Sequence, residues 1–274
     1  MSSINKRKYH KVLTIAGSDS GGGAGIQADL KTMSAIGCYG MSVITALTAQ
    51  NTRGVTGIHA VPPSFVAEQI DAVFSDIGAD AVKIGMLFSA ELIEVIAGQL
   101  KKYGAEKIIL DPVMVAQSGD KLLQDDAIQA IKEYLMPLAD VVTPNIPEAE
   151  VLIDRDIRGL DDMQTAAKSL AGWGSRSILI KGGHLEANDS TDLLYIAGEN
   201  RFVRLEAHRI VSNNNHGTGC TLSSAIAGYM ARGNDIEDAV RKAKTYIQNA
   251  IRAGADYTIG HGHGPVHHFF EFWK

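Results

Sequence analysis

The feature that most constrains the fold is a regular alternation of short apolar runs with amphipathic helical patterns. Several of the short runs are apolar at nearly every position, which is typical of parallel strands covered by helices on both faces. The alternation therefore predicts a doubly wound α/β sandwich with a central, mostly parallel sheet. The predicted strands are Val12–Ala16, Met41–Ala46, Val55–Val61, Ala81–Ile84, Lys107–Leu110, Asp140–Thr143 and Ser177–Lys181. The predicted helices are Ile26–Ile36, Ser64–Ser75, Ala90–Tyr103, Asp125–Leu135, Ile146–Asp154, Met163–Gly172, Thr221–Arg232 and Ile236–Gly254.

Chain length and composition fit one large α/β domain or two small ones. The 274 residues are 45% hydrophobic, which is enough for one large core. A late hairpin is predicted from Asp192–Ala197 and Arg201–Ala207, around the turn residues 198–200. Because the sequence has no repeat, low-complexity tract or linker, we expect a single domain over residues 1–274.

Charge and hydropathy exclude several classes of protein. The net charge is −5, and no basic run extends beyond Lys6–Lys8, so nucleic acid is not an expected partner. No stretch approaches the roughly 20 apolar residues of a membrane span, and Val12–Ala16 is too short for a signal peptide. The two cysteines, Cys38 and Cys220, are too few for a disulfide framework. We therefore expect a cytoplasmic protein with no membrane partner.

A glycine turn, Gly217-Thr218-Gly219, stands directly before the apolar helix pattern that begins at Thr221. The first turn of a helix has backbone N–H groups without an internal partner, and the helix dipole adds positive potential there. Glycines let an anion approach these donors closely. The turn therefore predicts a phosphate-sized anion site and favours phosphoryl transfer.

Cys220 lies inside this predicted anion site. A helix N-terminus stabilises a thiolate, so we expect a lowered pKa for its thiol. The thiol is then a candidate general base or a covalent nucleophile with His216 as its base, as in a thiol hydrolase. A small buried apolar side chain is the third interpretation, and the surrounding glycines make it the least favoured.

The first predicted strand is followed by a glycine-rich loop that ends at Asp29. Residues Gly23–Ala28 match a loose dinucleotide-binding pattern, but no Asp or Glu occurs between Asp29 and Glu68, where a ribose-binding acid is required. The alternatives are a flexible turn and a loop whose backbone approaches a ligand closely. The number of glycines favours the ligand.

Other polar motifs also follow predicted strands, at the sheet edge where α/β proteins bind ligands. Gln50 offers a donor and an acceptor suited to the edge of a heterocycle, although alone it is more typical of a turn and gains weight only from its position after a strand. Met86 is suited to packing on a flat ring, although a core position explains it as well.

Three oxygen-bearing side chains and a lysine complete the set. Asp111, Asn145 and Glu148 form a group suited to Mg²⁺ and the phosphates of a nucleotide. In isolation Asp111 fits a turn before proline, and Glu148 fits a helix-capping acid. Lys181 is a candidate phosphate-binding lysine, against the alternative of a solvated side chain. No Gly-Lys-Ser/Thr sequence occurs, so a P-loop is excluded.

Taken in order, these motifs resemble the ribokinase superfamily of ATP-dependent small-molecule kinases, and within it the hydroxymethylpyrimidine/phosphomethylpyrimidine kinases of thiamine biosynthesis. The resemblance is carried by AGSDSGGGAGIQADLKT, SVITALTAQNT, VKIGML, LDPVM, TPNIPEAE, KGGH and HGTGCTLSSAIA. It implies a three-layer α/β/α fold, with ATP near Lys181 and the Gly217–Gly219 turn. Magnesium and phosphate are implied near Asp111, Asn145 and Glu148. The implied pyrimidine pocket comprises Gly17, Asp29, Thr48, Gln50, Met86 and Val113.

The resemblance also implies an activity. Such kinases use Mg²⁺ and ATP to phosphorylate 4-amino-5-hydroxymethyl-2-methylpyrimidine and then its monophosphate. Asp29 and Gln50 are expected to orient the aminopyrimidine, and Cys220 stands where the wider superfamily has its aspartate base. Cysteine there is shared with a group of pyridoxal kinases, so that substrate stays an alternative, as do a thiol hydrolase and a ligand-sensing module. We expect a homodimer.

Overall fold

The computed structural model describes residues 7–114, 125–183 and 191–273, which form one sheet and the helices around it. The sheet is nine-stranded, with the order β3-β2-β1-β4-β5-β6-β7-β8-β9. Strands β2, β1, β4, β5, β6 and β7 run parallel, whereas β3, β8 and β9 pair antiparallel with their neighbours at the two edges. The strands are β1 (Lys11–Asp19), β2 (Tyr39–Asn51), β3 (Gly54–Ala60), β4 (Ala81–Ile84), β5 (Ile108–Leu110), β6 (Val141–Val142), β7 (Ser177–Ile180), β8 (Asp192–Ile196) and β9 (Arg201–Leu205).

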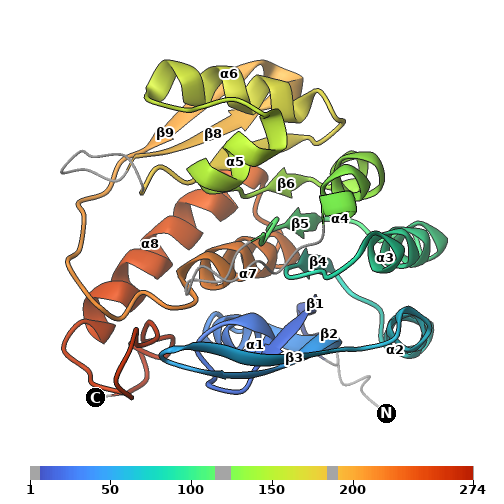
Figure 1. Cartoon of the computed structure of the whole chain (residues 1–274), viewed down its shortest axis with the longest axis horizontal. Coiled ribbons are helices and arrows are strands. Elements are labelled where there is room, and N and C mark those ends of the chain that lie inside the picture. The colour runs from blue at the N-terminus through green and yellow to red at the C-terminus, as the bar shows by residue number, and fades with distance from the viewer. Residues whose placement is uncertain (1–6, 115–124, 184–190, 274) are drawn as a thin grey trace, which may run out of the picture.

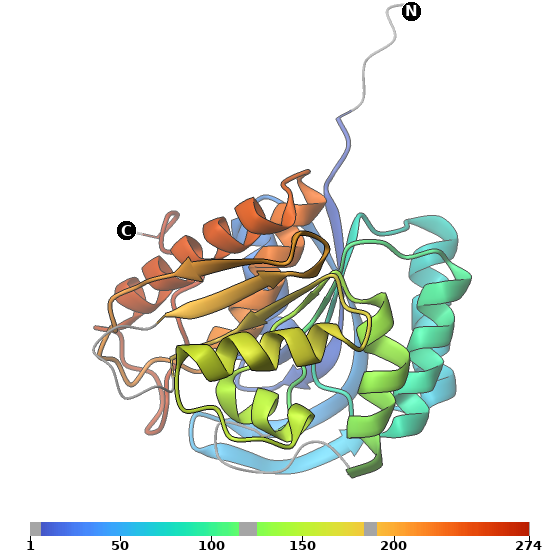
Figure 2. The same ribbon diagram turned by 90° about the horizontal axis from the view of Figure 1, so that it is seen from above.

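Helices cover both faces of this sheet, as Figures 1 and 2 show from two directions. One face carries α1 (Gly25–Ala35), α7 (Thr218–Ala231) and α8 (Ile236–Gly254). The other face carries α2 (Pro63–Asp76), α3 (Ala90–Lys102), α4 (Asp125–Ala130), α5 (Ile146–Ile153) and α6 (Leu160–Ala171). After α4 the chain continues through a π turn (Ile131–Leu135) and a 3-10 turn (Met136–Leu138). The predicted three-layer α/β/α sandwich is therefore confirmed.

Two apolar cores, one on each face, explain the continuous apolar runs of the strands. Successive side chains of a strand point to opposite faces. In β5, Ile108 and Leu110 belong to the core under α2 to α6, whereas Ile109 between them belongs to the core under α1, α7 and α8. A strand that is buried on both sides needs an apolar residue at every position.

The difference between structure and sequence prediction that bears on the site is the start of α7. The helix begins at Thr218 rather than at Thr221, because Gly217 adopts a left-handed conformation and its carbonyl accepts the first helical hydrogen bond, from Thr221. Cys220 consequently lies within the first turn of the helix. The late hairpin and the bounds of α8 agree with the prediction. In the part of the chain that the structure describes, no helix is long and apolar enough to cross a membrane.

Candidate active site

A cleft of about 740 Å³ lies outside the carboxyl ends of the parallel strands. This volume is in the range of small-molecule sites. The cleft brings together twelve of the fourteen predicted site residues and leaves out Gly17 and Asp29. The twelve residues are Thr48, Gln50, Met86, Asp111, Val113, Asn145, Glu148, Lys181, Gly217, Thr218, Gly219 and Cys220.

The glycine turn at the start of α7 forms one wall of the cleft. Gly217 has φ +80°, and a Cβ added there would overlap the carbonyl of Gly23, so the turn packs directly on the glycine-rich loop. A Cβ added at Gly219 would lie 3.4 Å from Nζ of Lys181, which shows how closely the backbone approaches this cation. Helix α7 has no side-chain cap and no acidic residue in its first turn. Its backbone donors are therefore suited to an anion, as the sequence predicted.

Asp111 and Lys181 form a buried ion pair opposite this turn. Nζ of Lys181 donates to Oδ1 of Asp111 at 3.0 Å and lies 3.8 Å from Oε2 of Glu148. Burial disfavours the charged form of Asp111, but the ammonium groups of Lys181 and Lys83 outweigh it and hold its pKa below the ordinary value. Burial likewise opposes the charge of Lys181, but Asp111 and Glu148 raise its pKa to about 12. Lys181 is thus a permanent cation on the cleft wall.

Asn145 and Glu148 form a capping box at the start of α5. The side chain of Asn145 accepts from the backbone of Glu148 at 2.8 Å, and Oε2 of Glu148 accepts from the backbone of Asn145 at 2.8 Å. The helix-capping interpretation is therefore correct for Glu148. Both side chains also line the cleft, so capping fixes them there.

The residues present fit a magnesium ion only in combination with a nucleotide. Within the described residues, no group of three or more His, Cys, Asp or Glu side chains is arranged to hold a metal. Asp111 and Glu148 offer two carboxylates on one wall of the cleft. Mg²⁺ usually takes one or two carboxylates together with substrate phosphates, so this donor set matches a shared site.

The pKa of Glu148 leads to a stability prediction. Burial raises its pKa to about 7, with Lys181 opposing the shift and Asp111 adding to it. An acid with a raised pKa stabilises the fold below its unfolded pKa, and this contribution is lost as pH rises from about 4.5 to about 7. The comparison is with Glu148→Gln, which has no titrating carboxyl at this position, and divalent cations are left out. We expect the difference in free energy of unfolding, wild type minus variant, to fall by on the order of 2 kcal/mol as pH rises over this range. Urea titrations at several pH values measure it, and parallel curves for the two proteins would contradict it.

The residues predicted to bind the ring form a second wall, built from the ends of β2 and β4 and the segment after β5. Oγ1 of Thr48 donates to the carbonyl of Ser18 at 2.8 Å and lies 3.1 Å from Oε1 of Gln50. Met86 and Val113 line the cleft with these polar groups. Gly17 lies behind Met86, since a Cβ added at Gly17 would lie 3.1 Å from the Met86 sulfur. Gly17 therefore makes room for a cleft residue instead of lining the cleft.

The structure contradicts the predicted position of Asp29. Its side chain is fully buried and pairs with Lys83, with Nζ 2.9 Å from Oδ2. The carboxylate also accepts hydrogen bonds from Thr14 and Ser224, both at 2.6 Å. Asp29 lies in the first turns of α1 as predicted, but it points into the core because that face of the helix packs against the sheet and α7. It is not available to a ring in the cleft.

The expectation of a lowered pKa for Cys220 is also wrong in this structure. Burial raises the pKa of its thiol to about 11; Lys83 lowers it, and the carboxylates of Asp29 and Asp111 raise it again. At neutral pH the thiol is therefore protonated. This is the opposite of an activated nucleophile, which argues against the thiol hydrolase alternative.

Asp19 is a site residue that the sequence reasoning missed. Its carboxylate accepts hydrogen bonds from the backbone of Gly21, Gly23 and Ala24 at 2.8–3.0 Å. Its Oδ2 also lies 2.9 Å from Nε2 of His216, the residue before the anion turn. Asp19 thus fixes the glycine-rich loop against the start of α7. An aspartate two residues before a glycine run is a turn-forming signal that points to this role.

A further set of cleft residues comes from the segment before α7 and from α8. The guanidinium of Arg209 donates to the carbonyl of Gly183 at 2.5 Å, which joins this segment to the end of β7. His184, which follows in the KGGH motif, lies outside the described residues. The segment has no periodic pattern, so sequence reasoning had no signal for it. The residues are His208, Arg209, Ile210 and Ser212 from the segment and Gln248 and Ile251 from α8, with Gly183 of the KGGH motif beside them.

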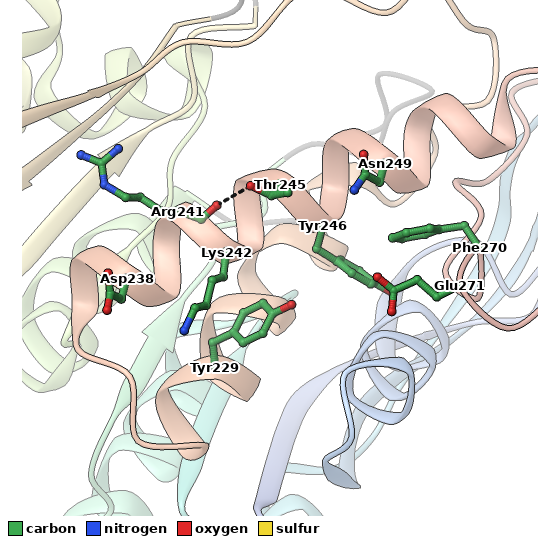
Figure 3. A pocket seen from close by; sticks show the side chains of 9 residues that line it. All are labelled: Tyr229, Asp238, Arg241, Lys242, Thr245, Tyr246, Asn249, Phe270 and Glu271. Carbon is green, nitrogen blue, oxygen red and sulfur yellow. Dashed lines mark hydrogen bonds between the residues drawn. The ribbon is translucent and has the colours of Figure 1, made fainter.

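A smaller pocket of about 360 Å³ lies on the outer side of α8 (Figure 3). Aromatic side chains, among them Tyr229, Tyr246 and Phe270, form one part of it, and charged side chains such as Arg241 and Lys242 line the rest. No strand end contributes to this pocket. The cleft at the carboxyl ends of the strands is therefore the candidate active site.

Comparison with known proteins identifies the family of this chain. Residues 19–267 match the family model described as phosphomethylpyrimidine kinase. The thiamine biosynthesis bifunctional protein ThiED of Geobacter sulfurreducens is 56% identical over 94% of this chain, and the chain spans 52% of that protein's length. The hydroxymethylpyrimidine/phosphomethylpyrimidine kinase of Rhizobium meliloti is 53% identical, over 96% of this chain and 98% of that protein.

A solved pyridoxal kinase from Staphylococcus aureus in complex with ADP has the same fold, with a TM-score of 0.89. It is 35% identical, over 97% of this chain and 96% of that chain. The lower identity favours the pyrimidine branch over pyridoxal kinases. Since the family model covers most of the chain and two relatives are more than half identical to it, the chain belongs to the phosphomethylpyrimidine kinase family.

Proposed function

We propose that this protein transfers the terminal phosphoryl group of ATP first to 4-amino-5-hydroxymethyl-2-methylpyrimidine and then to its monophosphate. The observation that carries the proposal is the composition of one cleft. Ring-binding side chains, a carboxylate–lysine group and an uncapped helix N-terminus face the same space. Phosphoryl transfer needs these three parts, since it depends on positioning the acceptor and stabilising the charge of the transferring group.

The pyrimidine is held at the ends of β2 and β4. The amide of Gln50 meets the ring nitrogens and the amino group, because it offers both a donor and an acceptor. The thioether of Met86 and the side chain of Val113 cover the ring faces. This arrangement points the hydroxymethyl group towards the start of α7.

The nucleotide occupies the opposite side of the cleft, near Lys181 and the segment around Ile210. The ammonium of Lys181 and the backbone donors of Gly217–Cys220 stabilise negative charge on the transferring phosphoryl group. Asp111 and Glu148, with Asn145 beside them, would hold Mg²⁺ together with the nucleotide phosphates. A bound Mg²⁺ would supply neutralisation of phosphate charge.

Cys220 leads to a step-specific prediction. In the first step the nucleophile is an alcohol that must lose a proton, whereas in the second step it is already a phosphate. If the thiol accepts the proton, Cys220→Ala should lower kcat for the alcohol by about 10²-fold and kcat for the monophosphate far less. Steady-state assays of both steps measure this difference.

The pH dependence provides the control for this prediction. Because the resting thiol has a pKa of about 11, a base role requires kcat/KM for the alcohol to rise with pH between 7 and 9, about tenfold per unit. Cys220→Ala should lose this slope, and Cys38→Ala, which changes the other cysteine, should keep it. Equal losses in both steps would leave Cys220 as a part of the anion site only.

The substrate proposal is tested with the purified protein, ATP and Mg²⁺. The hydroxymethylpyrimidine and pyridoxal are offered separately, and ADP formation is followed. We expect the larger kcat/KM for the pyrimidine; a larger value for pyridoxal would overturn the choice of substrate. If neither alcohol leads to ADP formation, the remaining alternative is a ligand-sensing module.

We further propose a single domain that acts as a homodimer in the cytoplasm. A dimer would elute at twice the chain mass of 29.3 kDa in size-exclusion chromatography with light scattering. A mass of one chain at working concentration would contradict the dimer.

A further inference from the structure

The side chains of Asp29 and Lys83 form an ion pair beneath the anion turn, and both have no exposed surface. Nζ of Lys83 lies 3.1 Å and 2.9 Å from the two carboxylate oxygens of Asp29. Isolating two charges from water is costly, and such a pair is weak evidence for stability. Its presence directly below the cleft therefore needs another explanation.

Asp29 joins four elements of the fold. It lies on α1, and it accepts from Thr14 on β1 at 2.6 Å, from Lys83 on β4, and from Ser224 on α7 at 2.6 Å. The N-terminal ends of α1 and α7 both line the cleft, at Gly25 and at Thr218. One carboxylate thus fixes the distance between two helices whose first turns both line the site.

Ser224 connects this carboxylate to the reacting region. It stands four residues after Cys220 on α7, so the two side chains lie on the same face of the helix. Packing around the connection is tight, because α1 and α7 are in direct contact and a Cβ added at Gly228 would overlap Ile36. A small displacement of α7 would therefore also move Cys220.

Lys83 adds a fixed positive charge below the turn. Burial opposes its charge, but Asp29 outweighs burial and raises the pKa of Lys83 above its ordinary value, with Cys220 and Asp111 contributing. Gly85 makes room for this ammonium, since a Cβ there would lie 2.6 Å from Nζ. The charge is thus permanent and close to the groups that face the cleft.

We propose that Asp29 is a positioning residue for phosphoryl transfer: through Ser224 it fixes the first turn of α7, and through Lys83 it places a buried positive charge beneath that turn. This inference rests on the proposed kinase function. It assigns Asp29 no contact with substrate. Both phosphorylation steps use the same turn, so both depend on Asp29 equally, unlike the step-specific role of Cys220.

A matched pair of variants tests the positioning role. Ser224→Ala and Thr14→Val each remove one hydroxyl that donates to Asp29 at 2.6 Å, and both residues are fully buried. We expect similar decreases in melting temperature for the two. Only Ser224→Ala should lower kcat, roughly tenfold in both steps with KM changed less than threefold, because only this bond reaches α7.

A second variant tests the charge. Asp29→Asn/Lys83→Met removes both ions, so no unpaired charge is left in the core. We expect a cooperative melting transition and a decrease of kcat of about 10²-fold in both steps. The control variant is Asp140→Asn/Arg176→Met, which removes an ion pair at the other end of the strands. Asp140 also accepts a hydrogen bond from the backbone of Ile108 there. This variant should keep wild-type kcat.

The outcomes separate this inference from the proposed function. If wild type transfers no phosphoryl group to the pyrimidine alcohol, the proposed function has failed. If wild type is active but Ser224→Ala and Thr14→Val have equal kcat, the positioning role is overturned. If Asp29→Asn/Lys83→Met folds and has wild-type kcat, the proposed role of the buried positive charge is overturned. If it does not fold, the comparison of Ser224→Ala with Thr14→Val decides the proposal.

Discussion

Replacing Lys181 by methionine is expected to lower kcat/KM about 10³-fold in both phosphorylation steps. Methionine keeps the unbranched apolar part of the side chain but removes the ammonium that lies 3.0 Å from Asp111 and 3.8 Å from Glu148. Two consequences follow from the loss of this cation. Phosphate oxygens lose an electrostatic partner, and two buried carboxylates that now repel each other have raised pKa values. Initial rates at saturating and limiting ATP measure the effect.

Lys244→Met is the matched control for this prediction. The Lys244 side chain is 12% exposed and that of Lys181 is 16% exposed, and each is paired with a buried carboxylate, Asp192 and Asp111 respectively. Lys244 does not line the cleft. We expect both variants to lose a comparable part of the free energy of unfolding, about 3 kcal/mol, and only Lys181→Met to lose activity. Activity of Lys181→Met within tenfold of wild type would refute the proposed role.

The second large effect is expected for Gly217→Ala, again about 10³-fold in kcat/KM for both steps. The left-handed conformation of Gly217 is unfavourable for alanine by roughly 1–2 kcal/mol. The methyl group would also overlap the carbonyl of Gly23, which is backbone and cannot rotate away. The glycine-rich loop and the start of α7 would have to separate, and the backbone donors would no longer converge on the phosphoryl group.

Gly233→Ala separates backbone strain from this overlap. Gly233 follows the other end of α7 and has φ +91°, but an added Cβ meets no atom within 4 Å. Gly233→Ala should therefore lose about as much free energy of unfolding to backbone strain as Gly217→Ala does, while its kcat/KM stays at the wild-type value. If the two glycine variants have the same kcat/KM, contact between the turn and the glycine-rich loop is not required for catalysis.

Sequence periodicity was sufficient for the fold because burial on both faces leaves a strong signal. The run Ile108–Leu110 is apolar throughout, and each of its faces enters a different core. The bounds of α8 followed directly from its periodicity, and Asp235 caps it with its side chain. The positions of Gln50, Met86 and Lys181 on one cleft were also predictable, because the carboxyl ends of parallel strands meet at one edge of a sheet. Thr48 and Val113 were expected there only from the family resemblance.

The errors concern properties that only three-dimensional packing decides. Asp29 in the first turns of α1 and Asp111 directly after β5 are both acids in predicted ligand-binding motifs, but the structure buries Asp29 beneath α7 and leaves Asp111 on the cleft wall. For Cys220, the expected effect of the helix N-terminus is exceeded by burial and two nearby carboxylates. The residues around Ile210 belong to a segment without periodicity and are joined to the site only by tertiary contacts such as Arg209 to Gly183.

The buried position of α7 determines when the geometry of the site is lost during unfolding. From Thr221 to Gly228 every residue of the helix is buried, and the helix is enclosed by α1, α8 and the sheet. Because of this burial, we expect its interior amides to exchange with solvent only when the whole domain opens, whereas the donors at its first turn face the cleft. The turn is thus attached to one of the last parts of the protein to unfold. Heat should abolish the geometry of the turn and the fold together, with no folded but inactive state between them.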